Sequence, residues 1–234
     1  MTQSYTNQKD SSFKSYLSKT YFAIAGGLLI SAVFAFLACE IVPLLFYTVP
    51  GFASLLMLIM PFAEIGVAIY FSSRLFAMNK KTAWTCYIAY SALTGFSLYS
   101  IFLYYDLGSL TLALVATIVM FVCMALIGRT SKFNFMSLYG LLIPALFAGI
   151  IVTLLNSLIF HSPFVDLAIA YVGIIIFLVI TAADVQKLEA FYNQSSYDNE
   201  LSEKLMVMGA FQLYLDFINI FLRILQFLGR RRDN

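Results

Sequence analysis

Seven long runs of apolar residues, separated by short polar or proline- and glycine-containing breaks, make up most of this sequence. A helix that crosses the hydrocarbon core of a bilayer needs about 20 consecutive, mainly apolar residues. Each run reaches roughly that length, so the pattern predicts seven membrane-spanning segments. The runs cover residues 21–47, 52–73, 82–105, 108–128, 134–160, 164–183 and 205–228.

The pattern within these runs favours helices over the strands of a membrane β-barrel. A barrel strand alternates apolar and polar residues over about ten positions, whereas residues 112–127 and 174–180 are apolar on every side. Proline, glycine or charged residues stand between the runs, as is typical of connections between helices. We therefore predict an all-α integral membrane protein with seven transmembrane helices.

The basic residues predict how the chain is oriented, because cytoplasmic loops collect Lys and Arg whereas acidic residues have little influence. Lys and Arg occur in the first twenty residues and in the connections 74–81, 129–132 and 187–204, and the alternate connections have none. We therefore interpret residues 1–20 as a cytoplasmic tail and residues 21–229 as the transmembrane domain.

The C-terminal tail, residues 230–234, conflicts with this orientation. Seven full crossings place the basic cluster Arg230-Arg231-Arg232 outside, although such a cluster favours the cytoplasm. Two interpretations therefore stay open. Either the last helix crosses fully and the rule fails there, or the last helix is re-entrant.

Composition excludes whole classes of protein. Hydrophobic residues make up 62% of the chain and charged residues 11%, whereas soluble domains carry about 25% charged residues. The net charge of +2 is small and scattered, so we expect the lipid bilayer as surroundings and no nucleic-acid partner. The three cysteines lie in separate apolar runs without CxxC spacing, which indicates buried apolar residues rather than a disulfide or zinc site.

An aspartate near the middle of the last run is the strongest candidate for a functional residue. A charge at the centre of a spanning helix costs about 2.5–3.5 kcal/mol on insertion scales. Asp216 has Gln212 four residues before it and Asn219 three residues after it, so the three share one helical face. Such a face is costly against lipid, so we expect the other six helices to surround the last one. Its polar side chains would then face a cavity or a partner, where Gln212 and Asn219 could line a pore. The alternative is a carboxyl group satisfied by polar neighbours in a packed core.

A second acid, Asp184, closes the sixth run, and one connection joins the sixth and seventh helices. Adjacent helices would let the carboxyl groups of Asp184 and Asp216 face each other. Two such groups in a low dielectric tend to share a proton, which makes the pair sensitive to pH. When ionised, the pair offers the oxygen ligands that suit Ca²⁺. Taken alone, Asp184 could equally be a solvated helix end.

Three further charged residues are candidates for roles along an ion path. Arg74, at the end of the second run, is the natural counter-charge for the acid pair; the alternative is an interfacial arginine with its head group in water. Glu64 lies about 15 Å further along the same helix at 1.5 Å per residue and could line a pore. Glu40, near the outer end of the first run, could line its mouth.

Signatures of common enzymes are missing, since the chain has no HExxH, GxSxG, P-loop or GxGxxG motif and a single histidine. An intramembrane aspartyl protease would also need two membrane aspartates. Those proteases carry glycine before the catalytic aspartate, whereas Ala183 and Leu215 precede the two acids here. We therefore expect no enzyme activity and no resident cofactor.

The residues around the two acids resemble the motifs of a known family. The stretch Leu213–Leu222, LYLDFINIFL, followed by Leu228-Gly229, is similar to the closing signature of the transmembrane Bax inhibitor motif family. The segment Asp184–Lys187 resembles the second acidic motif of that family, and Tyr90–Gly95 resembles its third helix. The resemblance covers essentially the whole hydrophobic chain in order and spacing.

The resemblance implies seven helices, six of them around a central last one, and a pH-sensitive Ca²⁺ leak. The acidic sensor of the family falls on Asp184 and Asp216, and its gating arginine falls on Arg74. The connection 185–204 looks longer and more acidic than in compact bacterial members. The short tails suit a prokaryotic plasma-membrane member.

Two hypotheses of different classes follow. In the first, the protein passes Ca²⁺ down its gradient, protons and Ca²⁺ compete at the Asp184–Asp216 pair, and Arg74 stabilises the closed state. In the second, it is a non-conducting membrane regulator that binds a membrane protease or a cell-death factor. A proton-coupled carrier is disfavoured, because the halves of the chain show no clear internal repeat.

Overall fold

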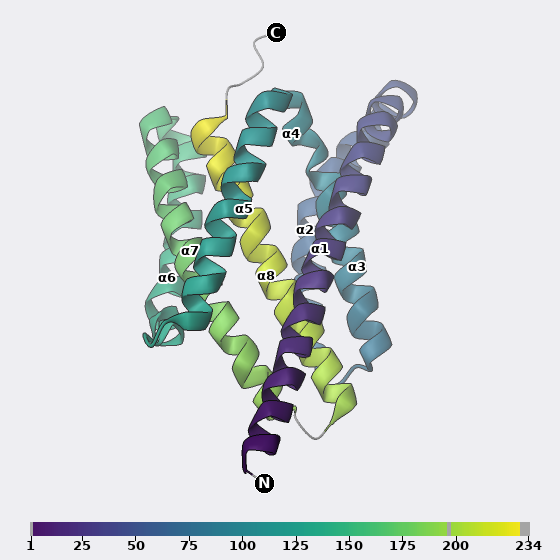
Figure 1. The fold of residues 1–234 in the computed structure, drawn as a ribbon. Coiled ribbons are helices and arrows are strands. Elements are labelled where there is room, and N and C mark those ends of the chain that lie inside the picture. The colour runs from purple at the N-terminus through teal and green to yellow at the C-terminus, as the bar shows by residue number, and fades with distance from the viewer. Residues whose placement is uncertain (1, 196–197, 230–234) are drawn as a thin grey trace. The chain divides into compact units, whose positions relative to one another are not determined.

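The protein consists of helices and short connections in the part that the computed structural model describes, residues 2–195 and 198–229, with side chains described from Ser12. No β-strand occurs in that part. The helices (Figure 1) are α1 (Thr2–Thr48), α2 (Pro50–Arg74), α3 (Lys80–Ser97), α4 (Tyr99–Tyr104), α5 (Leu107–Thr130), η1 (Phe135–Leu138), α6 (Tyr139–Leu155), η2 (Asn156–Phe160), α7 (Pro163–Gln194) and α8 (Asn199–Leu228). Within those described ranges, seven stretches are long and apolar enough to cross a membrane, with α3–α4 and η1–α6–η2 each counted as one. The predicted all-α, seven-helix class is confirmed.

The last helix is the one most enclosed by protein. Of its most apolar window, 67% is buried, against 33% or less in each of the other six spanning stretches. A helix with a polar face needs such burial, and the arrangement of all six other helices around it stays a prediction. Because α8 is uninterrupted over 30 residues, it is about 45 Å long at 1.5 Å per residue. That length without a break favours a full crossing over the re-entrant alternative.

The connection predicted at 185–204 is mostly helical, so that prediction was wrong. Helix α7 continues to Gln194 and α8 begins at Asn199, which leaves four residues between them. Asp184 accordingly lies ten residues before the end of α7 and does not close the helix. Charged residues mark where a helix leaves the hydrocarbon, whereas its backbone hydrogen bonds continue into water.

The two predicted tails have different outcomes. Helix α1 begins at Thr2, so the polar residues 1–20 are largely part of the same helix as the first spanning segment. The side of the membrane on which they lie stays a prediction. The predicted basic tail, residues 230–234, lies outside the described residues.

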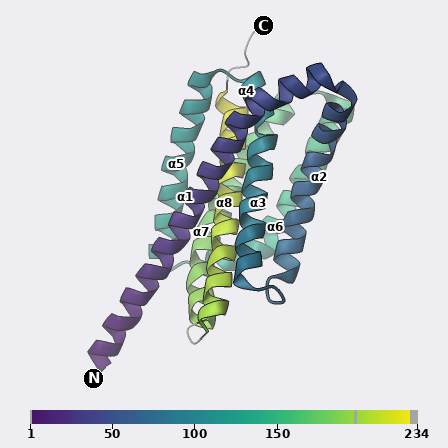
Figure 2. The same ribbon diagram turned by 90° about the vertical axis from the view of Figure 1, so that its right-hand side faces the viewer.

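The chain divides into two compact units, of which the first comprises Met1–Tyr104 and Phe191–Phe211. In this unit α1 packs along α3, and α2 packs against both (Figure 2). Small and hydroxyl-bearing residues bring α1 and α3 close together. The Ser31 hydroxyl donates to the Ser91 carbonyl at 2.7 Å, and the Tyr87 hydroxyl donates to the Ala23 carbonyl at 2.9 Å.

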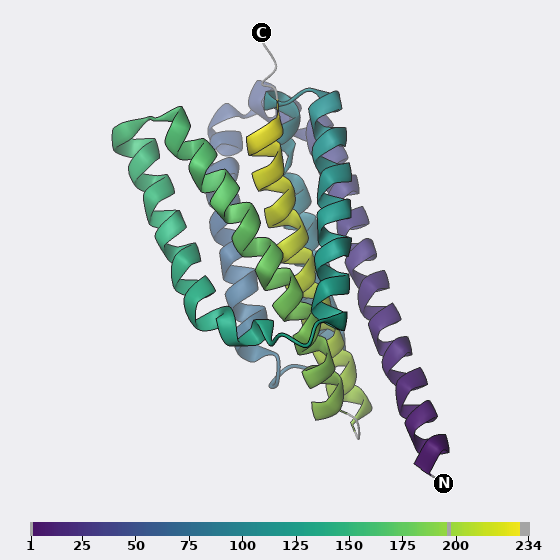
Figure 3. The same cartoon turned by 60° about the vertical axis from the view of Figure 1, so that its left-hand side comes forward.

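The second unit comprises Tyr105–Ala190 and Gln212–Asn234. Helices α6 and α7 run antiparallel within it and are joined through η2 (Figure 3). The Asn156 side chain fixes this turn, because its amide donates to the Asp166 carboxylate at 2.7 Å and its oxygen accepts from the Ser162 backbone at 3.0 Å. Phe121 of α5 meets Phe217 of α8 edge to face, with ring centroids 5.5 Å apart.

Asp106 caps the N-terminus of α5, and this cap should make stability depend on pH. Its carboxylate accepts from the Ser109 backbone at 2.9 Å and from the Ser109 hydroxyl at 2.7 Å, and the hydroxyl bond in particular lowers the pKa of Asp106 from its ordinary value of 3.8. A lowered folded-state pKa gives stability that is present above the ordinary value and lost as pH falls through the lowered one.

We expect Asp106→Ala to lower the thermal unfolding temperature in detergent at neutral pH, and the difference from the native protein to shrink as the cap becomes protonated. Asp106→Asn is the matched control, because asparagine caps helices about as well as aspartate and does not titrate. A difference between native protein and Asp106→Ala that stays constant down to the acid range would contradict this assignment.

Candidate functional site

The structure brings the two predicted acids, Asp184 of α7 and Asp216 of α8, together inside the second unit. The two side chains are only 6% and 4% exposed. Their carboxyl groups lie within hydrogen-bonding reach of each other. Two carboxyl groups can share a hydrogen bond only if one of them is protonated, so this geometry suits a pair that holds one proton.

One oxygen of this pair lacks a partner. Asp216 Oδ2 is fully buried, and no described residue donates a hydrogen bond to it. The nearby Thr181 hydroxyl lies within reach of Asp216, but it donates to the Phe177 carbonyl at 2.8 Å. Buried polar atoms in native proteins nearly always have a partner. A proton or a cation is the natural partner for this carboxyl oxygen.

Two further side chains belong to the surroundings of the acids. Tyr139, the first residue of α6, donates its hydroxyl to Asp184 Oδ1. Lys187, one turn beyond Asp184 on α7, places its ammonium 5.7 Å from the centre of the Tyr139 ring and acts electrostatically on both acids. One cation and one phenol thus face two carboxyl groups, so full ionisation leaves a net negative charge.

The local sequence explains why these groups meet. Ala182 and Ala183, next to Asp184, are completely buried, and their small side chains let α7 approach its neighbours closely. At Gly128 of α5, a Cβ atom would lie 2.4 Å from the Ala182 carbonyl oxygen. The Gln186 amide clamps the chain before α6, donating to the Phe133 carbonyl at 2.7 Å and accepting from the Phe135 backbone at 2.8 Å.

The other polar residues of α8 have separate surroundings. Asn219 is half-buried and donates to the Leu215 carbonyl one turn earlier, at 2.8 Å. It lines, with Arg223, a largely apolar cavity of about 500 Å³ between α6, α7 and α8. Gln212 is half-buried. Their predicted pore-lining role stays a prediction.

The remaining predicted residues lie in the first unit. Glu64 of α2 is half-buried and accepts hydrogen bonds from Ser97 and, at 3.4 Å, from Thr94, both of α3. Glu40 of α1 and Arg74 at the end of α2 are exposed. Neither forms an ion pair with a described residue of its own unit. Because Arg74 and the acid pair belong to different units, its role as counter-charge stays a prediction.

The oxygen atoms at the acid pair suit a loosely held hard cation. Ca²⁺ takes six to eight oxygen ligands at about 2.3–2.6 Å. The pair offers up to four carboxylate oxygens, with the hydroxyl groups of Tyr139 and Thr181 nearby. Across the described residues, no three His, Cys, Asp or Glu side chains gather to hold a metal. Water must complete the coordination, so an ion here would exchange readily.

Comparison with known proteins gives a match over nearly the whole chain. The family model described as "Inhibitor of apoptosis-promoting Bax1" matches residues 13–233. A protein of Borreliella burgdorferi is 33% identical over 222 residues, which cover 94% of this chain and 93% of that protein. Protein RP147 of Rickettsia prowazekii is 34% identical over 227 residues, 96% of this chain and 93% of its own length.

The inner membrane protein YbhL of Escherichia coli K12 is 31% identical over 226 residues, which cover 96% of this chain and 95% of that protein. The family match contains both aspartates and all seven apolar runs, which extend from residue 21 to residue 228. The fold and the matches agree: this multi-pass integral membrane protein belongs to the Bax inhibitor family.

Proposed function

We propose that this protein is a pH-sensitive leak channel that lets Ca²⁺ pass down its gradient, with the Asp184–Asp216 pair as ion site and proton-sensitive gate. The observation that carries the proposal is the buried Asp216 Oδ2, which has no hydrogen-bond donor among the described residues and lies beside a second buried carboxyl group. Such an oxygen takes either a proton or a cation, and that choice is the proposed switch.

The ion step depends on the charge of the pair. When both acids are ionised, their oxygens attract a divalent cation, and the low number of protein ligands keeps binding weak enough for release. A first proton on the pair removes one of the two charges and weakens the ion site, and a second proton removes the site. Tyr139 and Lys187 stabilise the ionised form, through the phenol hydrogen bond and the positive charge.

The gate requires two conformations that differ in which groups pair with the two carboxylates. Arg74 stabilises the closed state in this proposal by pairing with the ionised acids. Partial protonation weakens that attraction, so a falling pH shifts the population towards the open state. The flux should therefore rise as the pH falls from the alkaline side, until full protonation removes the ion site.

The proposed location is the plasma membrane of a prokaryote. The E. coli relative is an inner membrane protein, and its similarity extends over 96% of this chain. The Lys and Arg residues of the first twenty positions and of alternate connections support a cytoplasmic N-terminus.

Calcium flux into proteoliposomes tests this proposal. Purified protein is reconstituted with a Ca²⁺-sensitive dye inside, and influx is followed between about pH 8 and about pH 6 under a fixed gradient. We expect pH-dependent influx for the native protein. For Asp216→Asn we expect at least about a tenfold loss of flux, equivalent to about 1.4 kcal/mol in barrier height, and a flat pH response.

Glu189→Gln is the matched control, since Glu189 is an exposed acid of the same helix as Asp184. It should conduct like the native protein. If Asp216→Asn keeps both the flux and its pH response, the gate assignment is wrong. If the native protein passes no Ca²⁺ at any pH, the channel proposal fails and the non-conducting regulator becomes the better hypothesis.

A further inference from the structure

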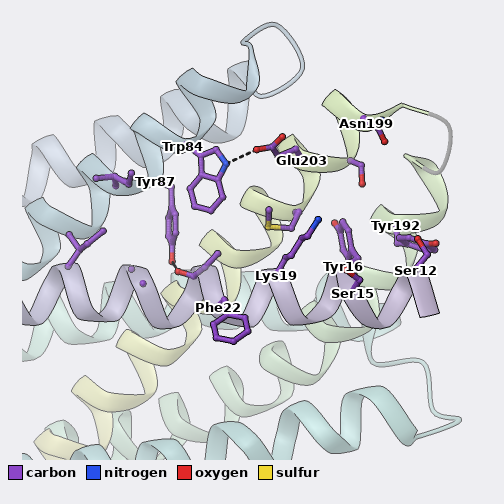
Figure 4. A pocket seen from close by; sticks show the side chains of 17 residues that line it. Ser12, Ser15, Tyr16, Lys19, Phe22, Trp84, Tyr87, Tyr192, Asn199 and Glu203 are labelled. Carbon is purple, nitrogen blue, oxygen red and sulfur yellow. Dashed lines mark hydrogen bonds between the residues drawn. The ribbon is translucent and has the colours of Figure 1, made fainter. Parts of the chain in front are cut away.

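A second cavity lies in the first unit, whereas the acid pair belongs to the second. It has a volume of about 790 Å³, within the range typical of ligand sites. Residues of α1 and α3, the end of α7 and the start of α8 line it (Figure 4). The acid-pair proposal uses none of these residues, so the cavity needs its own explanation.

The cavity is polar at one end and apolar at the other. Along α1 its lining begins with Ser12, Ser15 and Lys19 and ends with Gly26 and Ile30. Those positions extend over about 27 Å at 1.5 Å per residue. The polar end lies just before the apolar run that begins at residue 21, which is where lipid phosphates meet a transmembrane helix. The lining thus has the polarity gradient of a phospholipid.

The polar end carries a cation without a bonded counter-ion. Glu203, the carboxylate on the opposite wall, is already engaged by Lys80 at 3.0 Å and by the Trp84 indole at 3.2 Å. Lys19 has no carboxylate within ion-pair distance among the described residues. In Figure 4, Lys19 and Tyr16 extend from α1 towards the helix that carries Glu203. This end therefore has a positive charge to offer an anionic group.

Tyr16 adds an independent indication. Its side chain is only 6% exposed, and its hydroxyl finds no hydrogen-bond partner among the described residues. A buried hydroxyl left unpaired costs about 1–3 kcal/mol. Tyr16 is one turn from Lys19 and lines the same cavity. After a small shift of the Tyr16 side chain, its hydroxyl would donate a hydrogen bond to a phosphate oxygen held by Lys19.

The apolar end has room for a hydrocarbon chain. A Cβ atom on Gly26 would meet nothing within 4 Å, whereas a Cβ on the neighbouring Gly27 would collide with the Tyr87 hydroxyl. The α1 surface at Gly26 therefore stays open, beside Ile30 and Ile88. We propose that this cavity binds one phospholipid, with the phosphate diester at Lys19 and Tyr16 and the start of an acyl chain over Gly26.

The single tryptophan of the chain makes this proposal testable, because Trp84 lines the cavity. Full-length protein in a phosphate-free maltoside detergent is titrated with phosphatidylglycerol whose acyl chains carry bromine near the glycerol, and quenching of Trp84 fluorescence is measured. We expect saturable quenching at one lipid per protein. Lys19→Gln should weaken the apparent affinity at least about fivefold, because the charge-assisted hydrogen bond to the phosphate is lost.

One control, Lys14→Gln, and a second cavity variant, Gly26→Leu, separate binding in the cavity from general lipid contact. Lys14→Gln removes a basic residue of α1 that lies outside the lining and should leave the affinity unchanged. Gly26→Leu fills the apolar end without touching any neighbour at its Cβ, so it should fold normally and also weaken binding.

Three outcomes would overturn the proposal. If quenching rises without saturation, and equally in the native protein and both cavity variants, the lipid contacts the protein surface without a specific site. Equal binding of brominated diacylglycerol means that the phosphate is not recognised. Full displacement of the lipid by inorganic phosphate at millimolar concentration means that the site takes a free anion.

Discussion

Gly128→Ala should destabilise the protein, although alanine is the better helix former by about 0.8–1 kcal/mol. A Cβ atom at Gly128 of α5 would lie 2.4 Å from the Ala182 carbonyl oxygen and 2.8 Å from the Ala182 Cα. Both atoms are backbone and cannot rotate away, so α5 and α7 must separate. Overpacking of this kind typically costs about 1–3 kcal/mol. The measurement is thermal unfolding in detergent together with the fraction of monodisperse protein.

Gly149→Ala provides the matched control within the same unit. A Cβ atom there would meet nothing within 4 Å, so only the helix preference of alanine remains and stability should stay equal or increase. The two substitutions are chemically identical, and their opposite effects would isolate the backbone contact. If Gly128→Ala unfolds at the native temperature or above it, α5 and α7 do not approach each other as described.

The same contact links stability to the acid pair. Ala182 lies two residues before Asp184, and both residues are buried. A shift of α7 away from α5 would therefore move the Asp184 carboxyl group relative to Asp216. We expect any Gly128→Ala protein that still folds to show an altered pH response of Ca²⁺ flux, a change that Gly149→Ala should not produce.

The number of spanning segments was predictable from the sequence, because a helix needs about 20 apolar residues to cross a bilayer. The breaks at Pro50, Asn79 and Asp106 lie next to the observed helix starts, because proline, asparagine and aspartate favour the first positions of helices. The end of α7 and the start of α8 were not predictable from hydropathy. Residues 185–204 are polar enough to leave the membrane, but polarity does not interrupt a helix in water.

Part of the site was also predictable. Asp216 stands out because a charge in an apolar run is costly, and Asp184 follows because one connection joins the last two helices, so that they can lie adjacent. Tyr139 could not be found in this way, since it lies 45 residues before Asp184 and is one of fifteen tyrosines. Only the packing of α6 against α7, held by the Gln186 amide, brings that phenol to the carboxyl group.

A double-substitution cycle tests whether the two acids act as one unit. If Asp184 and Asp216 contributed independently, the flux losses of Asp184→Asn and Asp216→Asn would multiply in the double variant. A pair that shares one proton loses its function when either member is replaced, so the double variant should conduct about as poorly as each single variant.

The fold should survive these substitutions, because in each single variant the asparagine amide can donate to the carboxyl group that remains, and in the double variant the two amides can pair. Equal elution profiles and unfolding temperatures for the four proteins would establish that the flux is compared between folded molecules. Flux losses that multiply, in proteins of native stability, would mean that the two carboxyl groups bind or sense ions separately. Their contact inside the second unit would then be packing alone, and the shared-proton gate would have to be abandoned.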